Sequence, residues 1–145
     1  MSVRIAVRYQ SRGGNTRAVA QVIGEQLGVE ALPVDTPLDE RVDLLFLGGG
    51  VYKWDADKSL IGFLKNLDPQ KVDQIAAFST TGGMKKAISR IIELSDKSGI
   101  KVNAQSLCLK LMAQGHTGLG RSGGHLTDKQ IEQVKTFAAM VVESA

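Results

Sequence analysis

Cysteine is scarce in this chain of 145 residues, which has a single one, Cys108. One thiol cannot form an internal disulfide, and it is too few for a zinc or iron–sulfur centre built on cysteine. A chain without disulfides is typical of a reducing compartment, so we expect a cytoplasmic protein.

Long hydrophobic runs are also missing. No apolar run approaches the roughly 18 residues of a membrane-spanning helix, and Arg4, Arg8 and Arg12 interrupt the segment where a signal peptide would need its apolar core. We therefore expect no membrane span.

The chain also has little excess of charge of one sign. Its net charge is +3, and the Lys and Arg side chains that produce it are scattered along the sequence. Such a pattern does not predict a nucleic-acid partner.

The chain does contain an alternation of short apolar runs and longer stretches with helical spacing. We expect strands at residues 3–9, 30–34, 44–47 and 75–78, and a less regular one within 104–109. Apolar spacing predicts helices over 19–27, 60–67, 84–92 and 131–142. No helix is expected between the second and third strands, where the segment is short and rich in turn residues.

This alternation predicts one α/β domain over residues 1–145, with a doubly wound parallel sheet covered by helices on both faces. The start of the last helix is the best-specified boundary. Thr127 and Gln130 form a capping-box pattern, and Leu126 and Ile131 have the spacing of a hydrophobic staple. In a doubly wound sheet, ligands bind beyond the carboxyl ends of the strands, so the loops that follow the strands are the candidate site.

The first of these loops is rich in glycine and hydrogen-bonding side chains and runs directly into a helix. Its residues are Ser11, Arg12, Gly13, Gly14, Asn15 and Thr16. Glycine allows backbone N–H groups to approach an anion closely, and the amino end of a helix carries partial positive charge. The loop therefore has the chemistry of a phosphate cradle, although it lacks the spacing of a Walker A motif. The alternative is a plain β–α turn in which Asn15 or Thr16 caps the helix.

The loops after the third and fourth expected strands also carry candidate residues. Tyr52 and Trp54 follow the third strand, and Tyr9 ends the first strand nearby. Flat rings at these places suit stacking on a planar heterocycle. The alternative for such aromatics is that they cover the core. The third loop is a run of hydroxyl residues and glycines, namely Ser79, Thr80, Thr81, Gly82 and Gly83.

At these residues the chain resembles the flavodoxin family, whose phosphate loop reads Ser/Thr-x-Thr-Gly-Asn-Thr directly after the first strand. The run from Ser11 to Thr16 matches this pattern except at Gly13, and the resemblance extends over nearly the whole chain. It implies a flavodoxin-like α/β/α domain whose five-stranded parallel sheet has the order 2-1-3-4-5.

The resemblance also implies FMN as a non-covalent cofactor. By analogy, Ser11, Gly14, Asn15 and Thr16 hold the phosphate, and Tyr52 or Trp54 stacks on the flavin ring. The peptide of Gly49 and Gly50 is expected near N5 of the ring. Thr80, Thr81, Gly82 and Gly83 correspond to the second ring loop. Gly13 removes one family hydroxyl, and Arg12 is expected to add a charge-assisted bond in its place.

Charge is the largest departure from the family, whose electron carriers are typically acidic. Basic residues outnumber acidic ones at the expected cofactor edge, with Arg12, Lys53, Lys85 and Lys86 against Asp55 and Asp57. A positive field stabilises the negative charge of a reduced flavin. We therefore predict a less negative midpoint potential than that of an acidic flavodoxin, to be measured by redox titration of both proteins. An equally negative value contradicts the prediction.

The resulting functional hypothesis is an electron carrier that works with redox partner proteins, one of them a flavin-linked or NAD(P)H-linked reductase. Two alternatives stay open. One is an FMN-dependent oxidoreductase acting on a small acceptor such as a quinone or porphyrinogen, and the other is a flavodoxin-fold module without flavin. No residue stands out as a proton donor, so no catalytic side chain is assigned.

Several other patterns are set aside. Residues 118–123 match Gly-x-Gly-x-x-Gly, but no later strand completes a βαβ unit, so a loop is expected there. Cys108 is expected to be a small buried thiol. His116 and His125 have no third metal ligand nearby in the sequence, and no metal is expected.

Overall fold

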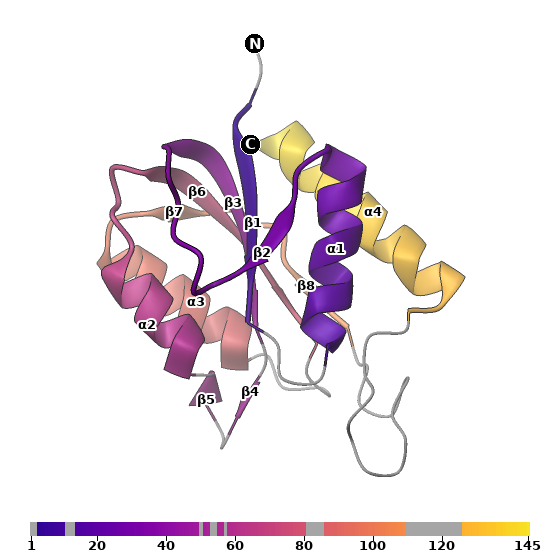
Figure 1. Ribbon diagram of the computed structural model, residues 1–145, viewed down its shortest axis with the longest axis horizontal. Helices are drawn as coiled ribbons and strands as arrows, with labels where there is room; N and C mark the ends of the chain where they lie inside the picture. Colours follow the sequence, from indigo (N-terminus) through magenta and orange to yellow (C-terminus); the bar gives the residue numbers. More distant parts are fainter. Residues whose placement is uncertain are drawn as a thin grey trace.

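The computed structural model describes residues 3–10, 14–49, 51–52, 55–56, 58–80, 86–109 and 126–145. Four helices and eight strands lie within these ranges (Figure 1). The helices are α1 (Asn15–Leu27), α2 (Lys58–Asn66), α3 (Lys86–Lys97) and α4 (Asp128–Ser144). The strands are β1 (Ile5–Tyr9), β2 (Ala31–Pro33), β3 (Val42–Gly49), β4 (Val51–Tyr52), β5 (Asp55–Ala56), β6 (Val72–Ser79), β7 (Lys101–Val102) and β8 (Leu107–Cys108).

The main sheet is parallel and has the order β2-β1-β3-β6-β7, with β8 also pairing with β6. The predicted order 2-1-3-4-5 is therefore confirmed. The fifth position needs a correction, because two short strands, β7 and β8, share it in place of the single, less regular strand that was expected there. A second correction is the small antiparallel sheet of β4 and β5, which falls in a segment expected to be a loop.

Helices cover both faces of the sheet, with α2 and α3 on one side and α1 and α4 on the other (Figure 1). Alternate side chains of β3 explain this layering. Leu45 and Leu47 belong to the core under α2 and α3, whereas Leu44 and Phe46 belong to the core under α1 and α4. All four are completely buried. A central strand that is apolar on both faces is what a three-layer α/β/α fold requires.

The cap of α4 follows the sequence pattern. The Thr127 hydroxyl accepts from the Gln130 backbone N–H at 3.2 Å, and the Gln130 side chain accepts from the Thr127 backbone N–H at 3.0 Å. Phe137, from the middle of this helix, meets Phe46 edge to face, with ring centroids 5.8 Å apart. The cap thus fixes where α4 starts and, with that, which face of the helix reaches the sheet.

The interruption of the fifth strand is built on Asn103. Its side-chain amide donates to Gln74 Oε1 at 2.7 Å and to Ser144 Oγ at 3.1 Å, and its Oδ1 accepts from the Gln105 backbone N–H at 2.8 Å. Asn103 and Gln74 are each 7% exposed. This buried network joins β6 to the end of α4 and turns the chain away from a continuous strand between β7 and β8.

The crossover from β2 to β3, residues 34–41, has no helix, as the sequence predicts, and an arginine supports it. Arg8 of β1 is only 7% exposed and donates to the carbonyls of Thr36 at 2.9 Å, Val7 at 3.1 Å and Pro37 at 3.2 Å. Burial lowers the pKa of Arg8 from its ordinary value, while the negative charges of Asp39 and Glu30 oppose that shift. Arg8 therefore anchors the crossover to the sheet.

Candidate functional site

Three strands end side by side at the edge of the sheet where ligands of doubly wound folds bind. Tyr9 at the end of β1 pairs with Gly48 of β3, and Gly49 pairs with Ser79 at the end of β6. The Gln10 backbone N–H also donates to the Gly48 carbonyl at 2.9 Å, just beyond the end of β1. The three candidate loops therefore leave the sheet next to one another. The order of the strands reverses between β1 and β3, so this edge includes the topological switch point.

The first loop ends at Gly14, which is the N-cap of α1 and has a positive φ of 93°. Glycine has no side chain with which to cap the helix, and a backbone hydrogen bond runs from the Ala18 N–H to the Gly14 carbonyl at 2.9 Å. The N-cap is therefore Gly14 and not Asn15 or Thr16, whereas the glycine with positive φ agrees with the alternative of a plain β–α turn. N–H groups in the first turn of an α-helix have no carbonyl partner within the helix, and they favour an anion there. Ser11, Arg12 and Gly13 lie outside the described residues.

Thr16 and Thr80 bring the first and third loops into direct contact. Their hydroxyl oxygens lie 2.8 Å apart, and either hydroxyl is able to donate. Thr16 is 3% exposed and Thr80 is 8% exposed. The sequence places each residue in a cofactor loop, but it carries no signal for a contact across 64 positions. Thr81, Gly82 and Gly83 lie outside the described residues.

The second loop follows β3, which ends at Gly49. Val51 and Tyr52 form β4, which pairs with Asp55 and Ala56 of β5. Figure 1 shows this small hairpin beyond the carboxyl edge of the main sheet. Gly50 and Trp54 lie outside the described residues.

Tyr9 belongs to the core more than to the loops. It is the last residue of β1, it is partly buried, and it packs against the core under α1 and α4. Its carbonyl accepts from the Val34 N–H at 2.8 Å. This placement agrees with the alternative reading for a loop aromatic, which is that it covers the core.

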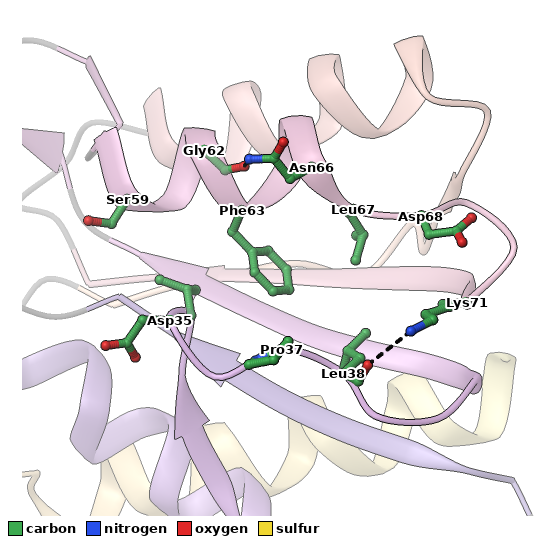
Figure 2. Close-up of a pocket in the computed structure, with 11 residues that line it drawn as sticks. Asp35, Pro37, Leu38, Ser59, Gly62, Phe63, Asn66, Leu67, Asp68 and Lys71 are labelled. Atoms are coloured by element: carbon green, nitrogen blue, oxygen red, sulfur yellow. Dashed lines mark hydrogen bonds between the residues drawn. The ribbon is translucent and has the colours of Figure 1, made fainter.

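A groove of about 480 Å³ lies between the helix-free crossover and α2 (Figure 2). The Phe63 ring of α2 faces Pro37 and Leu38 across it, and Lys71 closes one end by donating to the Leu38 carbonyl at 3.3 Å. The lining residues are Val34, Asp35, Pro37, Leu38, Ser59, Gly62, Phe63, Asn66, Leu67, Asp68 and Lys71. The groove is a consequence of the missing crossover helix, because only a loop covers this part of the sheet.

The part of the chain that the structure describes contains no group of three or more His, Cys, Asp or Glu side chains placed to hold a metal ion. Cys108 lies at the end of β8 and is only partly buried, whereas the sequence predicts a buried thiol. His116 and His125 lie outside the described ranges. Within those same ranges, no helix has the length and apolar character that crossing a membrane requires.

The fold defines a doubly wound α/β protein whose candidate loops lie beside the switch point. A family model described as the flavodoxin domain matches residues 6–117. The chain therefore belongs to the flavodoxin family, and this membership indicates FMN as its cofactor. A search of curated proteins gave no match.

Solved structures share the fold at low sequence identity. Rubredoxin oxygen:oxidoreductase from Desulfovibrio gigas matches with 18% identity and a TM-score of 0.73, over 97% of this chain but only 35% of its own. The oxidised Flavodoxin 2 from Bacillus cereus matches with 18% identity and a TM-score of 0.73, over 98% of this chain and 99% of its own. A flavodoxin from the domain Archaea matches with 21% identity and a TM-score of 0.66, over 97% of this chain and 96% of its own.

Proposed function

We propose that this chain binds FMN at the carboxyl edge of its sheet and carries electrons between redox partner proteins. The observation that carries the proposal is the start of α1, which opens at the switch point through an N-cap glycine with a positive φ of 93°. A helix that starts at a glycine at this place is suited to an anionic group such as the FMN phosphate.

At the phosphate end, the residues fit the group chemically. Thr16 adds a buried hydroxyl to the first turn of α1, and Gly14 allows the backbone to turn sharply into the helix. In the proposal, Ser11, Gly14, Asn15 and Thr16 hold the phosphate, as in the family pattern. Arg12 supplements them with a charge-assisted bond, which takes the place of the family hydroxyl that is absent at Gly13.

At the ring end, the proposal uses the loops after β3 and β6. Gly49 and Ser79 are paired neighbours, so these two loops start from adjacent positions. The peptide of Gly49 and Gly50 and the aromatic pair Tyr52 and Trp54 are assigned to one side of the flavin. Thr81, Gly82 and Gly83 are assigned to the other loop. FMN, when bound, supplies the redox chemistry, and the chain's residues bind and orient it.

The assignment as a carrier is supported by the similarity in fold to the Bacillus cereus flavodoxin, which extends over nearly the whole length of both chains. The proposed carrier is a single domain over residues 1–145, is located in the cytoplasm and has a flavin-linked or NAD(P)H-linked reductase as one partner. With FMN bound, the purified chain is expected to oxidise NAD(P)H negligibly on its own and to be reduced when such a reductase is added. Rapid turnover with a small quinone and no reductase favours the oxidoreductase alternative.

The binding test compares FMN with riboflavin, which has the same ring system and no phosphate. We expect FMN to bind at least about a hundredfold more tightly, because two charge-assisted hydrogen bonds to the phosphate are together worth about 3 kcal/mol. Titration followed by flavin fluorescence measures both affinities. No FMN binding, or equal affinity for the two flavins, contradicts the proposal.

Two glycines at opposite ends of α1 give a matched pair of variants for this test. Gly14 has a φ of 93° and Gly28 has a φ of 73°, so an alanine at either position costs about 1–2 kcal/mol of backbone strain. Gly14→Ala is expected to lower FMN affinity about tenfold, because it shifts the start of the helix. Gly28→Ala is expected to lose similar stability and to keep its FMN affinity. Equal FMN affinities for the two variants would place the phosphate elsewhere.

A further inference from the structure

The hydroxyls of Thr16 and Thr80 form a buried pair that joins two separate loops of the candidate site. Thr16 is the second residue of α1, and Thr80 directly follows β6. Their oxygens are 2.8 Å apart, and each residue is at least nine-tenths buried. The family pattern from Ser11 to Thr16 includes the first hydroxyl. It says nothing about the second as its partner.

A hydroxyl has one proton to donate and two lone pairs that accept. If Thr16 donates to Thr80, its only proton is used within the protein. If Thr80 donates to Thr16, the Thr16 proton remains for a third group. The direction of this one hydrogen bond therefore decides whether Thr16 is a donor or only an acceptor toward a ligand.

An anion at the start of α1 favours one direction. Such a group accepts hydrogen bonds only, and it lies at the positive end of the helix dipole. When Thr80 donates to Thr16 and Thr16 donates to the anion, both protons point toward the negative charge. Each of the two hydrogen bonds then polarises the other. The opposite direction presents an oxygen lone pair to the anion, which is repulsive.

Thr80 also restricts the position of the Thr16 side chain. Threonine in a helix is divided between two χ1 rotamers, and a fixed partner for Oγ1 selects one of them. Fixing the donor before the ligand arrives reduces the ordering cost of binding. Thr80 thus contributes both the direction of the Thr16 proton and the orientation of its hydroxyl.

We propose that Thr80 is a positioning residue for phosphate recognition: it donates to Thr16 and thereby directs the Thr16 hydroxyl at the phosphate of FMN. The inference rests on the proposed function and deepens it. It also changes the role that the sequence suggests for Thr80, from a member of the ring loop to a partner of the phosphate loop.

The test measures the ratio of FMN affinity to riboflavin affinity. Thr80→Val removes the hydroxyl with little change in shape, and we expect the ratio to fall about tenfold while riboflavin affinity stays the same. Thr80→Ser restores the hydroxyl and is expected to restore the ratio. Ser95→Ala is the control, because Ser95 Oγ is buried in α3 without a hydrogen-bond partner among the described residues. This control is expected to leave the ratio unchanged.

A double-mutant cycle tests whether Thr80 acts through Thr16. In a Thr16→Val background, Thr80→Val is expected to have no further effect on FMN affinity, since the hydroxyl it directs is already gone. Additive losses overturn the inference, as does an unchanged ratio in Thr80→Val or a parallel loss of affinity for both flavins. Thermal unfolding checks each variant, and Thr80→Ala replaces Thr80→Val if the latter does not fold.

The wild-type protein separates this inference from the proposed function. If the wild type shows no preference for FMN over riboflavin, the proposed function fails and the role of Thr80 fails with it. If the wild type prefers FMN and Thr80→Val keeps that preference, only the role of Thr80 is overturned.

Discussion

Gly48→Ala is expected to lower the free energy of unfolding by about 3 kcal/mol. A Cβ at this position would lie inside van der Waals contact distance of three ring atoms of Phe78. Phe78 is completely buried on the neighbouring strand, so any shift of its ring disturbs the packed core around it. Chemical denaturation of the variant and the wild type measures the difference.

Two further variants test this cause. Gly62→Ala adds the same carbon where no atom lies within 4 Å, and it is expected to cause no loss of stability. In a Phe78→Leu background, Gly48→Ala is expected to cost less than half as much, because the smaller side chain leaves room for the added carbon. An equal cost in both backgrounds would mean that the Phe78 ring is not the obstacle.

The position of Gly48 links this packing constraint to the candidate site. Its carbonyl accepts from the Gln10 N–H, directly before the segment assigned to the phosphate, and Phe78 lies two residues before Thr80. The glycines after the apolar run therefore have a packing role within the strand as well as a place beside the candidate site. Gly48 and Gly49 belong to β3 itself, and the first of them is required because an aromatic ring covers it.

Elements that depend on local sequence were predictable. The runs that form β3 and β6 are buried on both faces, and a continuous apolar run is the local signature of such strands. The capping box of Thr127 and Gln130 lies within four consecutive residues, so its two hydrogen bonds follow from spacing alone. The order of the parallel strands also followed, because right-handed crossovers and the family resemblance leave little choice.

Features that depend on distant partners were not predictable. The contact between Thr16 and Thr80, the role of Asn103 in dividing the fifth strand, and the burial of Arg8 each join segments that are far apart in the sequence. The pairing of β4 with β5 was missed for another reason. Each of its strands has only two residues, too few to show the alternation by which a strand is identified.

Arg8→Leu is expected to lower the free energy of unfolding by about 3 kcal/mol and to loosen the crossover at residues 34–41. The guanidinium of Arg8 donates to three backbone carbonyls, two of them in a crossover that has no helix to hold it. Hydrogen bonds from a charged donor contribute about 1.5–3 kcal/mol each, and bonds that share one donor group are not additive. Chemical denaturation measures the loss, and faster amide exchange at Thr36 is expected to locate it.

Arg4 of the same segment provides the matched control. Its side chain is 65% exposed and forms a surface ion pair with Glu40 at 3.6 Å, so Arg4→Leu is expected to change stability by less than about 1 kcal/mol. Arg8→Lys keeps the charge but replaces a planar fork with a single ammonium, which cannot bond all three carbonyls in their present places. It is expected to recover less than half of the loss.

Because guanidinium stays protonated at ordinary pH, the cost of Arg8→Leu should be the same from about pH 6 to pH 9. A full recovery with lysine would show that charge, rather than the geometry of the three bonds, holds the crossover and the groove beside it in Figure 2.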